Sequence, residues 1–515
     1  MRYYLICVFG IVAMLAACSQ TASASSDDED NAAESSSSEN GKSSSSKDSK
    51  KISSSSTEES EECVGETGVP WDGTTAKSFA CGAGTKLSPY IIQTAEQLAY
   101  LSFVVNASDK DYKGKYFKLG ADIKLNKGDV IDEKGALVGD STKLHKWTPI
   151  GNSSVAFDGT FDGDDHTVSG MFVNTTSTHN GLFGNSSGTI QNLTVDNSWV
   201  KGGNATAGVL GILNGAGILK EVINKSSVVG SGQATGGVAA GIATVCCNKI
   251  GTIDNAENYG FVSGKQDVGG IIGGAKDIRI FNVKNDATIE GAKTVGGIAG
   301  NLGYNSNLTK AVNYGKISGK EMVAGISGYY GYMISCSTTG KNGVAEKIRN
   351  YGTIEGQSYT AGIFGKNDCT KNLGAVNEAK VVGSTYTAGL FGYVKNSITE
   401  NGYNVGDVYG LNYVGGVAGY NEVGITQSLY STGKVDGDSL VGLMIGYNYN
   451  TTMADYYYLK QGEQEPFGLN NGGGVATPKS ADEMKSEDFA ELLGDEFVYD
   501  SGLNDGYPLL SWEKE

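Results

Sequence analysis

A short motif, two glycines enclosing two mostly apolar residues, recurs about every 27 residues over much of this chain. A period of that length indicates stacked copies of one small structural unit, because a single copy cannot bury its own apolar face. Clear copies begin at Gly181, Gly208, Gly270, Gly297, Gly325, Gly362, Gly389 and Gly416, and looser ones lie at Gly237–Gly241 and Gly442–Gly446. The sequence therefore predicts a repetitive body of about ten units.

Each unit contains two or three short strand-like runs separated by Gly or Asn, as in Ala311–Gly319 followed by Val323–Gly328. Gly and Asn tolerate the left-handed backbone that tight turns need. Too few residues remain for a crossover helix, and a propeller blade needs about 40 residues. We predict an all-β fold, a parallel β-helix (β-solenoid) of about ten coils, one coil per repeat.

The composition divides the chain into five segments: a signal peptide (1–18), a tether (19–62), an N-terminal cap with the first coils (63–172), the repeats (173–458) and a C-terminal cap (459–515). Capping boxes at Thr94–Gln97 and Ser480–Glu483 predict a short helix in each cap, the second running through Leu493. We expect the C-terminal cap to fold over the last coil.

The first residues have the features of an export signal. Leu5–Leu15 is apolar but too short for a permanent membrane anchor. The following Leu15-Ala16-Ala17-Cys18 resembles the bacterial lipobox. That resemblance implies lipidation of Cys18, attachment to a membrane through this lipid, and a place at the outer membrane or cell surface. An ordinary secretory signal with a chance cysteine is the alternative.

The net negative charge of the chain limits the kinds of partner that it can bind. The formal net charge is −17, and no cluster of Lys or Arg is present. The Ser-rich tether is itself acidic and has almost nothing apolar to bury, which predicts disorder. We expect no binding to nucleic acid or to an anionic membrane surface.

Cysteine usage fits an oxidising, exported setting. Cys63 and Cys81 flank the start of the folded part and are one candidate disulfide. Cys336 and Cys369 follow glycine motifs in consecutive repeats, so stacking could bring them together. The state of the adjacent Cys246 and Cys247 stays open, and no cysteine pair has the spacing of a zinc site.

The repeats resemble the bacterial surface proteins that carry the GLUG motif, which Gly181–Gly184 and Gly389–Gly392 match well. The resemblance extends upstream to Tyr112–Leu119, Trp147–Gly151 and Phe157–Gly163. It implies cell-surface and adhesin-like roles. Some members are attached to immunoglobulin-A-cleaving metallopeptidases, but the three histidines of this chain form no HExxH motif.

An acidic group at Asp158, Asp162, Asp164 and Asp165, beside His166, is the sharpest candidate for chemistry. Two of its carboxylates could serve as acid and base in glycoside cleavage, or the group could bind Ca²⁺. Our preferred interpretation is that these are turn residues between the buried positions Phe157, Phe161 and Val168. We therefore predict no catalytic residues, no metal and no cofactor.

Tyrosines recur in register with the repeat and should form ladders along the coils. The three ladders are Tyr359/Tyr386/Tyr413, Tyr393/Tyr420/Tyr447 and Tyr403/Tyr430/Tyr457. Our preferred ligand-binding surface is the second ladder, which Tyr329 and Lys366 extend into earlier coils. Exposed rings offer flat apolar faces to sugars or to a protein partner. The alternative is that the ladders pack inward or shield turns.

Taken together, these features predict a lipid-anchored, non-enzymatic adhesin or binding protein for glycans or a surface partner. Two alternatives stay open. One is a carbohydrate-active enzyme, a hydrolase or a lyase, that uses Asp158–Asp165. The other is a structural envelope spacer without a ligand.

Overall fold

The computed structural model describes residues 63–243, 249–331, 336 and 343–514. The proposed signal peptide and tether, the lipidation candidate Cys18, and Cys246 and Cys247 lie outside these residues. Among the described residues, no helix combines the length and apolar character needed to cross a bilayer.

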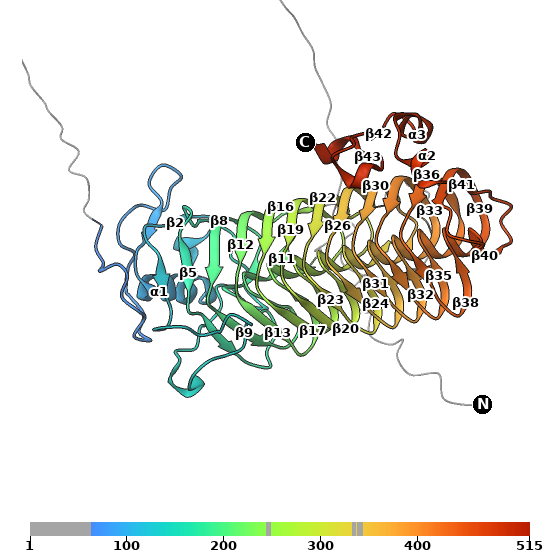
Figure 1. Ribbon diagram of the computed structural model, residues 1–515. Helices are drawn as coiled ribbons and strands as arrows, with labels where there is room; N and C mark the ends of the chain where they lie inside the picture. Colours follow the sequence, from blue (N-terminus) through green and yellow to red (C-terminus); the bar gives the residue numbers. More distant parts are fainter. Residues whose placement is uncertain (1–62, 244–248, 332–335, 337–342, 515) are drawn as a thin grey trace, which may run out of the picture. The chain divides into compact units, whose positions relative to one another are not determined.

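The described chain winds into a parallel β-solenoid of about 13 turns (Figure 1). This confirms the predicted all-β fold. About ten turns were predicted from the glycine motif, and further turns precede it. There Phe117 pairs with Phe161, which pairs with Ile190. Because the first two residues are separated by a long excursion rather than by 27 residues, the early turns have no visible sequence period.

Two large parallel sheets run along the solenoid. The larger has 24 strands among the described residues. They are β1 (Tyr90–Ile92), β2 (Tyr116–Leu119), β3 (Ile123–Lys124), β4 (Thr160–Asp162), β5 (Thr167–Ser169), β7 (Phe183–Ser186), β8 (Thr189–Asp196), β11 (Leu210–Asn214), β12 (Ile218–Asn224), β15 (Ala239–Ala243), β16 (Gly251–Asn258), β18 (Ile272–Ala275), β19 (Ile278–Asn285), β21 (Ala299–Leu302), β22 (Asn307–Asn313), β25 (Ser327–Gly331), β26 (Val344–Asn350), β29 (Phe364–Asp368), β30 (Lys371–Asn377), β33 (Phe391–Asn404), β36 (Ala418–Ser431), β39 (Ile445–Leu459), β40 (Phe467–Asn470) and β41 (Thr477–Lys479).

The second sheet has 17 strands among the described residues. They are β6 (Phe172–Asn174), β9 (Trp199–Gly202), β10 (Thr206–Ala207), β13 (Ser227–Gly230), β14 (Gln233–Gly236), β17 (Val262–Gly269), β20 (Ile289–Gly296), β23 (Ile317–Ser318), β24 (Glu321–Ala324), β27 (Ile354–Glu355), β28 (Ser358–Ala361), β31 (Val381–Val382), β32 (Thr385–Ala388), β34 (Val408–Tyr409), β35 (Asn412–Gly415), β37 (Val435–Asp436) and β38 (Ser439–Gly442). A small antiparallel pair, β42 (Phe497–Val498) and β43 (Leu509–Leu510), lies near the C-terminus.

Three α-helices accompany the strands: α1 (Ala95–Asn106), α2 (Ala481–Met484) and α3 (Glu487–Leu493). Four 3₁₀ turns complete the described elements: η1 (Lys110–Tyr112), η2 (Ser141–Lys143), η3 (Asn504–Gly506) and η4 (Ser511–Lys514). Both predicted capping boxes are present, at Thr94 and at Ser480. The second does not open one continuous helix, because the chain leaves helical geometry at Lys485 and Ser486 caps a separate helix.

The motif glycines are required by close contact between coils. A Cβ atom on Gly362 would lie 2.2 Å from the carbonyl oxygen of Gly389 and 2.3 Å from Cγ of Asn377. Gly389 would meet Gly416 and Asn404 in the same way. Neither glycine has a positive φ. The expectation that the repeat glycines supply left-handed turns is therefore wrong for these positions, where only a residue without a side chain fits.

A ladder of buried asparagines lies against these glycines. Asn285 donates its side-chain amide to Oδ1 of Asn313 at 2.8 Å, and Asn313 donates to Asn350 at the same distance. The members are Asn224, Asn258, Asn285, Asn313, Asn350, Asn377 and Asn404, all fully buried. Each bond satisfies an amide that would be costly to bury alone. The ladder therefore holds each coil in register with the next.

The first part of the C-terminal cap, residues 459–479, covers the last coil as expected. The rest, residues 480–514, which we call the C-terminal segment, does not. Instead α2, α3, β42 and β43 lie along the side of the solenoid, next to β30, β33 and β36 (Figure 1). Phe489 and Leu510 are buried there in one cluster with Tyr403 and Tyr430. The last coil is followed by β40 and β41, which pair with β39. The C-terminal segment therefore packs against several coils from the side.

Candidate functional site

Two of the predicted tyrosine ladders lie side by side on the solenoid. In the first, the ring centroids of Tyr359 and Tyr386, and of Tyr386 and Tyr413, are 4.7 Å apart with nearly parallel rings. In the second, Tyr393 and Tyr420 stack at 5.2 Å. Edge-to-face contacts join the ladders, for example Tyr386 to Tyr420 at 6.2 Å. We call Tyr359, Tyr386, Tyr413, Tyr393, Tyr420 and Tyr447 the tyrosine surface.

The first ladder sits on an unfavourable backbone. Tyr359, Tyr386 and Tyr413 have φ values of 53°, 55° and 56°. This left-handed conformation costs a residue with a side chain about 1–2 kcal/mol. Asn or Gly would suit it better. The same conformation recurs at the equivalent place in other coils, which carry Ala234, Asp267, Thr294, Met322 and Leu440 there. The left-handed backbone therefore belongs to this corner of the coil whatever residue occupies it, and the tyrosines differ from the other occupants only in their stacked rings.

The rings of the tyrosine surface are half-buried. Parallel stacking means that each interior ring covers part of the face of its neighbour. The surface therefore presents ring edges and hydroxyl groups as well as faces, which differs from the flat faces that we expected. Tyr447 departs from the pattern, because its ring is nearly perpendicular to that of Tyr420, at 89°.

Lys366 and Tyr329 hold the predicted places in the second ladder, where Tyr329 pairs with Lys366 and Lys366 with Tyr393. The ammonium of Lys366 lies 5.2 Å from the ring centroid of Tyr393, within range of a cation–π contact. Tyr329 is only 3% exposed. The ladder is thus accessible from Lys366 onward, but not at Tyr329.

Glu422 links this ladder to the neighbouring strand. Its carboxylate accepts hydrogen bonds from the Tyr393 hydroxyl and from Lys395, the latter at 2.9 Å. Burial opposes ionisation, but these two hydrogen bonds outweigh it and hold the pKa of Glu422 below its ordinary value. Burial, together with the bond to Glu422, raises the pKa of Tyr393. Tyr393 is therefore a neutral hydrogen-bond donor at neutral pH.

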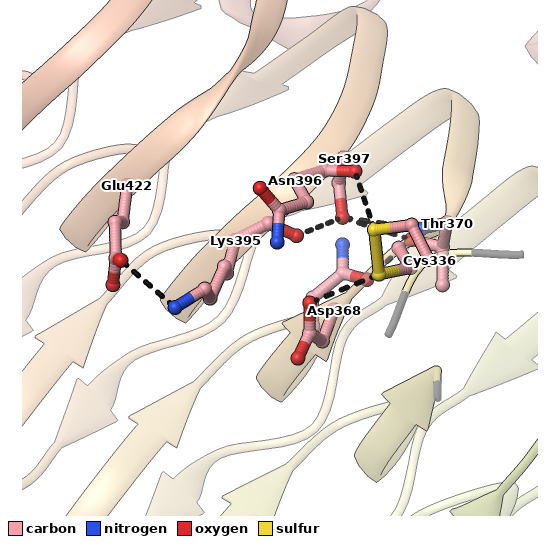
Figure 2. The surroundings of a disulfide bond; sticks show 9 residues. Cys336, Asp368, Thr370, Lys395, Asn396, Ser397 and Glu422 are labelled. Atoms are coloured by element: carbon pink, nitrogen blue, oxygen red, sulfur yellow. Dashed lines mark hydrogen bonds and ion pairs between the residues drawn. A yellow bond between two sulfur atoms is a disulfide. The ribbon is translucent and has the colours of Figure 1, made fainter. Parts of the chain in front are cut away.

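Both predicted cysteine pairs are disulfides in the structure, Cys63–Cys81 and Cys336–Cys369. Figure 2 shows the second, with Asp368 beside it and the Lys395–Glu422 pair on the adjoining strands. In the part of the chain that the structure describes, Cys336, Asp368 and Cys369 are the one group close enough to hold a metal ion. Both sulfurs are consumed by the disulfide, so they are not available as thiolate ligands.

The third predicted ladder is inaccessible. Tyr403 and Tyr430 are fully buried, and Tyr457 is 7% exposed. The Tyr403 hydroxyl donates to Glu513 at 2.9 Å, and Phe489 packs on Tyr457 with centroids 5.3 Å apart. Arg349 pairs with the same Glu513 at 2.8 Å. This ladder holds the C-terminal segment and has no open face, as the packing alternative for the ladders anticipated.

Three of the four carboxylates of the acidic group, those of Asp158, Asp162 and Asp164, bind neighbouring protein groups. Asp158 accepts from the backbone of Gly114, and Asp162 accepts from Gln191 and Asn192. Asp164 pairs with Lys118 at 2.9 Å. Asp164 and Asp165 have φ values of 48° and 62°, as expected of turn residues. His166 contacts Asp122, outside the group, at 3.2 Å. This geometry favours the turn interpretation.

Sequence reasoning treated the two exposed ladders as separate and missed Glu422. The signal for their adjacency was present. Tyr386 and Tyr393 flank the same motif, Gly389–Gly392. The short segment between Tyr386 and Tyr393 turns one corner of the coil, so its two ends lie on the same side. The two ladders that contain these residues must therefore be neighbours. Glu422 had a weaker signal, because its column is chemically mixed: Asp368 and Lys395 precede it and Tyr449 follows it.

No protein-family model matches the chain. Halomucin of Haloquadratum walsbyi is 31% identical over 171 residues, which is 32% of this chain and 2% of halomucin. A provisionally named Gly-rich membrane protein of Evansella cellulosilytica is 34% identical over 137 residues, 26% of this chain and 14% of that protein. The chain therefore corresponds to a small part of the length of either relative.

Among solved structures, a candidate immunoglobulin A1 protease from Bacteroides ovatus aligns with 84% of this chain and 95% of its own chain. The TM-score is 0.41 and the sequence identity 17%.

Proposed function

We propose that this chain is a non-enzymatic, adhesin-like binding protein of the cell surface, held to the outer membrane by a lipid on Cys18. The tyrosine surface, with Lys366 beside it, contacts a glycan polymer or a surface protein. The observation that carries this proposal is the run of stacked, half-exposed rings that the tyrosine surface forms over adjacent coils, with Tyr386 between Tyr359 and Tyr413 and with Tyr393 on Tyr420. Aromatic surface that stays partly open to solvent over several adjacent coils is typical of a binding surface.

Two further points support a place outside the cell. The described disulfides are typical of oxidising compartments. One relative is named as a membrane protein, which agrees with an envelope location. We also propose that the chain is a GLUG-motif surface protein, because Gly181–Gly184 and Gly389–Gly392 match that motif.

Pull-down of the mature protein on insoluble polysaccharides and on intact cells tests the binding role. We expect the Tyr393→Ala/Tyr420→Ala variant to lose most of the bound fraction, since each ring contributes apolar contact and a hydroxyl. The matched control is Tyr259→Ala/Tyr314→Ala. These two tyrosines are 40% and 46% exposed at another corner of the coils. Full binding by the first variant, or no binding to any surface by the wild type, contradicts the proposal.

The anchor has a separate test. The wild type should partition with membranes and gain the mass of a diacylglyceryl group and a fatty acid, and Cys18→Ala should remain soluble and unmodified. A wild type released without added mass contradicts lipidation and leaves the binding result untouched.

A further inference from the structure

A groove with unusual chemistry runs beside helix α1 at the N-terminal end of the solenoid. Two cavities, of about 540 and 640 Å³, share Asn106, Lys146, Trp147 and Thr148 in their linings and so form one continuous depression. We call it the N-terminal groove. Its lining includes residues of α1. This helix lies at the end of the solenoid remote from β33 and β36, which carry part of the tyrosine surface (Figure 1).

The lining contains no carboxylate. The whole chain carries a net charge of −17, yet the groove is built from aromatic, aliphatic, Ser, Thr and Asn residues with Lys146 and His179. Burial lowers the pKa of His179, so its imidazole is neutral at neutral pH. Lys146 is therefore the single formal charge. A concave surface of uncharged hydrogen-bonding groups in an acidic protein suits a polar, uncharged ligand.

Aromatic rings form one end of the groove. Phe103, on α1, is 63% exposed, which is unusual for a phenylalanine on a helix whose other apolar residues face the core. Trp71 is half-buried and packs edge-on against Trp147 with centroids 5.9 Å apart. The Trp71 indole donates to the backbone oxygen of Thr74 at 2.6 Å, which holds the ring in place. These rings offer apolar platforms beside the polar lining.

The polar wall is held by hydrogen bonds before any ligand arrives. Asn106 donates to the backbone oxygen of Pro149 at 3.0 Å and accepts from Asn152 at 3.1 Å. Ser102 donates to the backbone oxygen of Thr148 at 2.9 Å. These bonds join α1 to residues 148–152 across the groove. A preformed site loses less conformational entropy on binding.

We infer that the N-terminal groove binds an uncharged oligosaccharide, with the apolar face of a sugar ring on Phe103 and Trp71 and its hydroxyls paired with the Asn, Ser and Thr side chains. Sugar rings carry an apolar C–H face and a rim of hydroxyls, and the groove has matching parts along its length. Lys146 donates hydrogen bonds to hydroxyl oxygens. The inference does not depend on the tyrosine surface.

Calorimetry with the full-length mature protein and the hexasaccharides of cellulose, chitin, xylan and mannan tests it. We expect at least one to bind, with an affinity that is unchanged between low and high NaCl because no ion pair forms. Phe103→Ala should weaken binding about tenfold through loss of the ring platform. Since Phe103 is exposed, this variant folds normally. Trp71→Ala provides the second measurement, and Tyr393→Ala/Tyr420→Ala, the control, should bind like the wild type.

Three outcomes overturn the inference. One is the absence of binding by all four hexasaccharides, and another is unchanged affinity in both Phe103→Ala and Trp71→Ala. The third is binding restricted to polygalacturonate or alginate, with a steep salt dependence and loss in Lys146→Ala, which would define a polyanion site. The pull-down tests the tyrosine surface separately when it is run in the Phe103→Ala/Trp71→Ala background, in which the groove no longer holds the polysaccharide.

Discussion

At the scale of the residue, the stability contribution of Tyr386 combines an unfavourable backbone conformation with favourable ring stacking. Left-handed backbone disfavours the residue by about 1–2 kcal/mol. Its ring is stacked on both sides, at 4.7 Å from Tyr359 and from Tyr413. Each aromatic pair contributes about 0.5–1.5 kcal/mol beyond area burial. The two stacking contacts together contribute about 1–3 kcal/mol, which offsets the cost that the backbone of this corner imposes.

This balance predicts that Tyr386→Asn leaves stability almost unchanged. Asn adopts left-handed backbone readily, which offsets the lost stacking. We expect the free energy of unfolding to change by less than about 1 kcal/mol while binding to the surface falls. Urea unfolding and pull-down on one preparation measure both. A large loss of stability would mean that the ladder serves packing alone.

The lowered pKa of Glu422 predicts that its contribution to stability at the tyrosine surface depends on pH. Its pKa in the folded protein is below the ordinary value of 4.5. The stabilisation from its hydrogen bonds with Tyr393 and Lys395 is therefore fully present above 4.5 and is lost as the pH falls through the lowered pKa. We expect the carboxyl signal of Glu422, followed by NMR, to titrate below 4.5. Glu422→Gln should remove this step, and a titration at or above 4.5 would contradict the prediction.

At the scale of the element, the asparagine ladder is the device that aligns the coils. Asn313 accepts from Asn285 and donates both to Asn350 and to the backbone oxygen of Gly315. Its neighbours are fully buried. A change at one rung therefore leaves polar groups unpaired in the rungs on either side, where water does not reach them.

We predict that Asn313→Ala destabilises the coils around it by about 1–3 kcal/mol, the cost of an unpaired buried polar group. Ser318→Ala, on the same coil at a half-buried position, is the control and should change stability little. Denaturant unfolding measures both variants. Equal stability of the two would show that the ladder contributes nothing.

At the scale of the whole molecule, each coil contacts mainly its immediate neighbours. Stability in such a protein is close to a sum over coils and their interfaces, so distant parts open independently. Among the described residues, some contacts do not follow this neighbour-only pattern. One is the hydrogen bond from Tyr403 to Glu513, which joins positions 110 residues apart. The C-terminal segment therefore makes the coils that it covers cooperate with one another.

This organisation predicts that Leu98→Ala acts locally. Leu98 is fully buried on α1, and its truncation should cost about 2–5 kcal/mol. Hydrogen–deuterium exchange should quicken in residues 90–125 and stay unchanged in residues 391–459. Faster exchange throughout the solenoid would contradict the independence of the coils.

The repeat period by itself determined which residues share a column. It predicted the β-solenoid and the three tyrosine ladders, and it placed Cys336 and Cys369 in consecutive repeats although they are 33 residues apart. A 27-residue step returns the chain to the same corner, so register follows from counting. Counting could not find the turns before the first motif, where the spacing between rungs is irregular.

Exposure was decided only by the tertiary structure. Tyr403 and Tyr420 repeat with the same period, yet the C-terminal segment buries the first and leaves the second open to solvent. The N-terminal groove likewise arises where α1 meets residues 146–152 and 174–180. Docking between segments far apart in the chain has no period, because it depends on complementary surfaces that exist only after the coils have stacked.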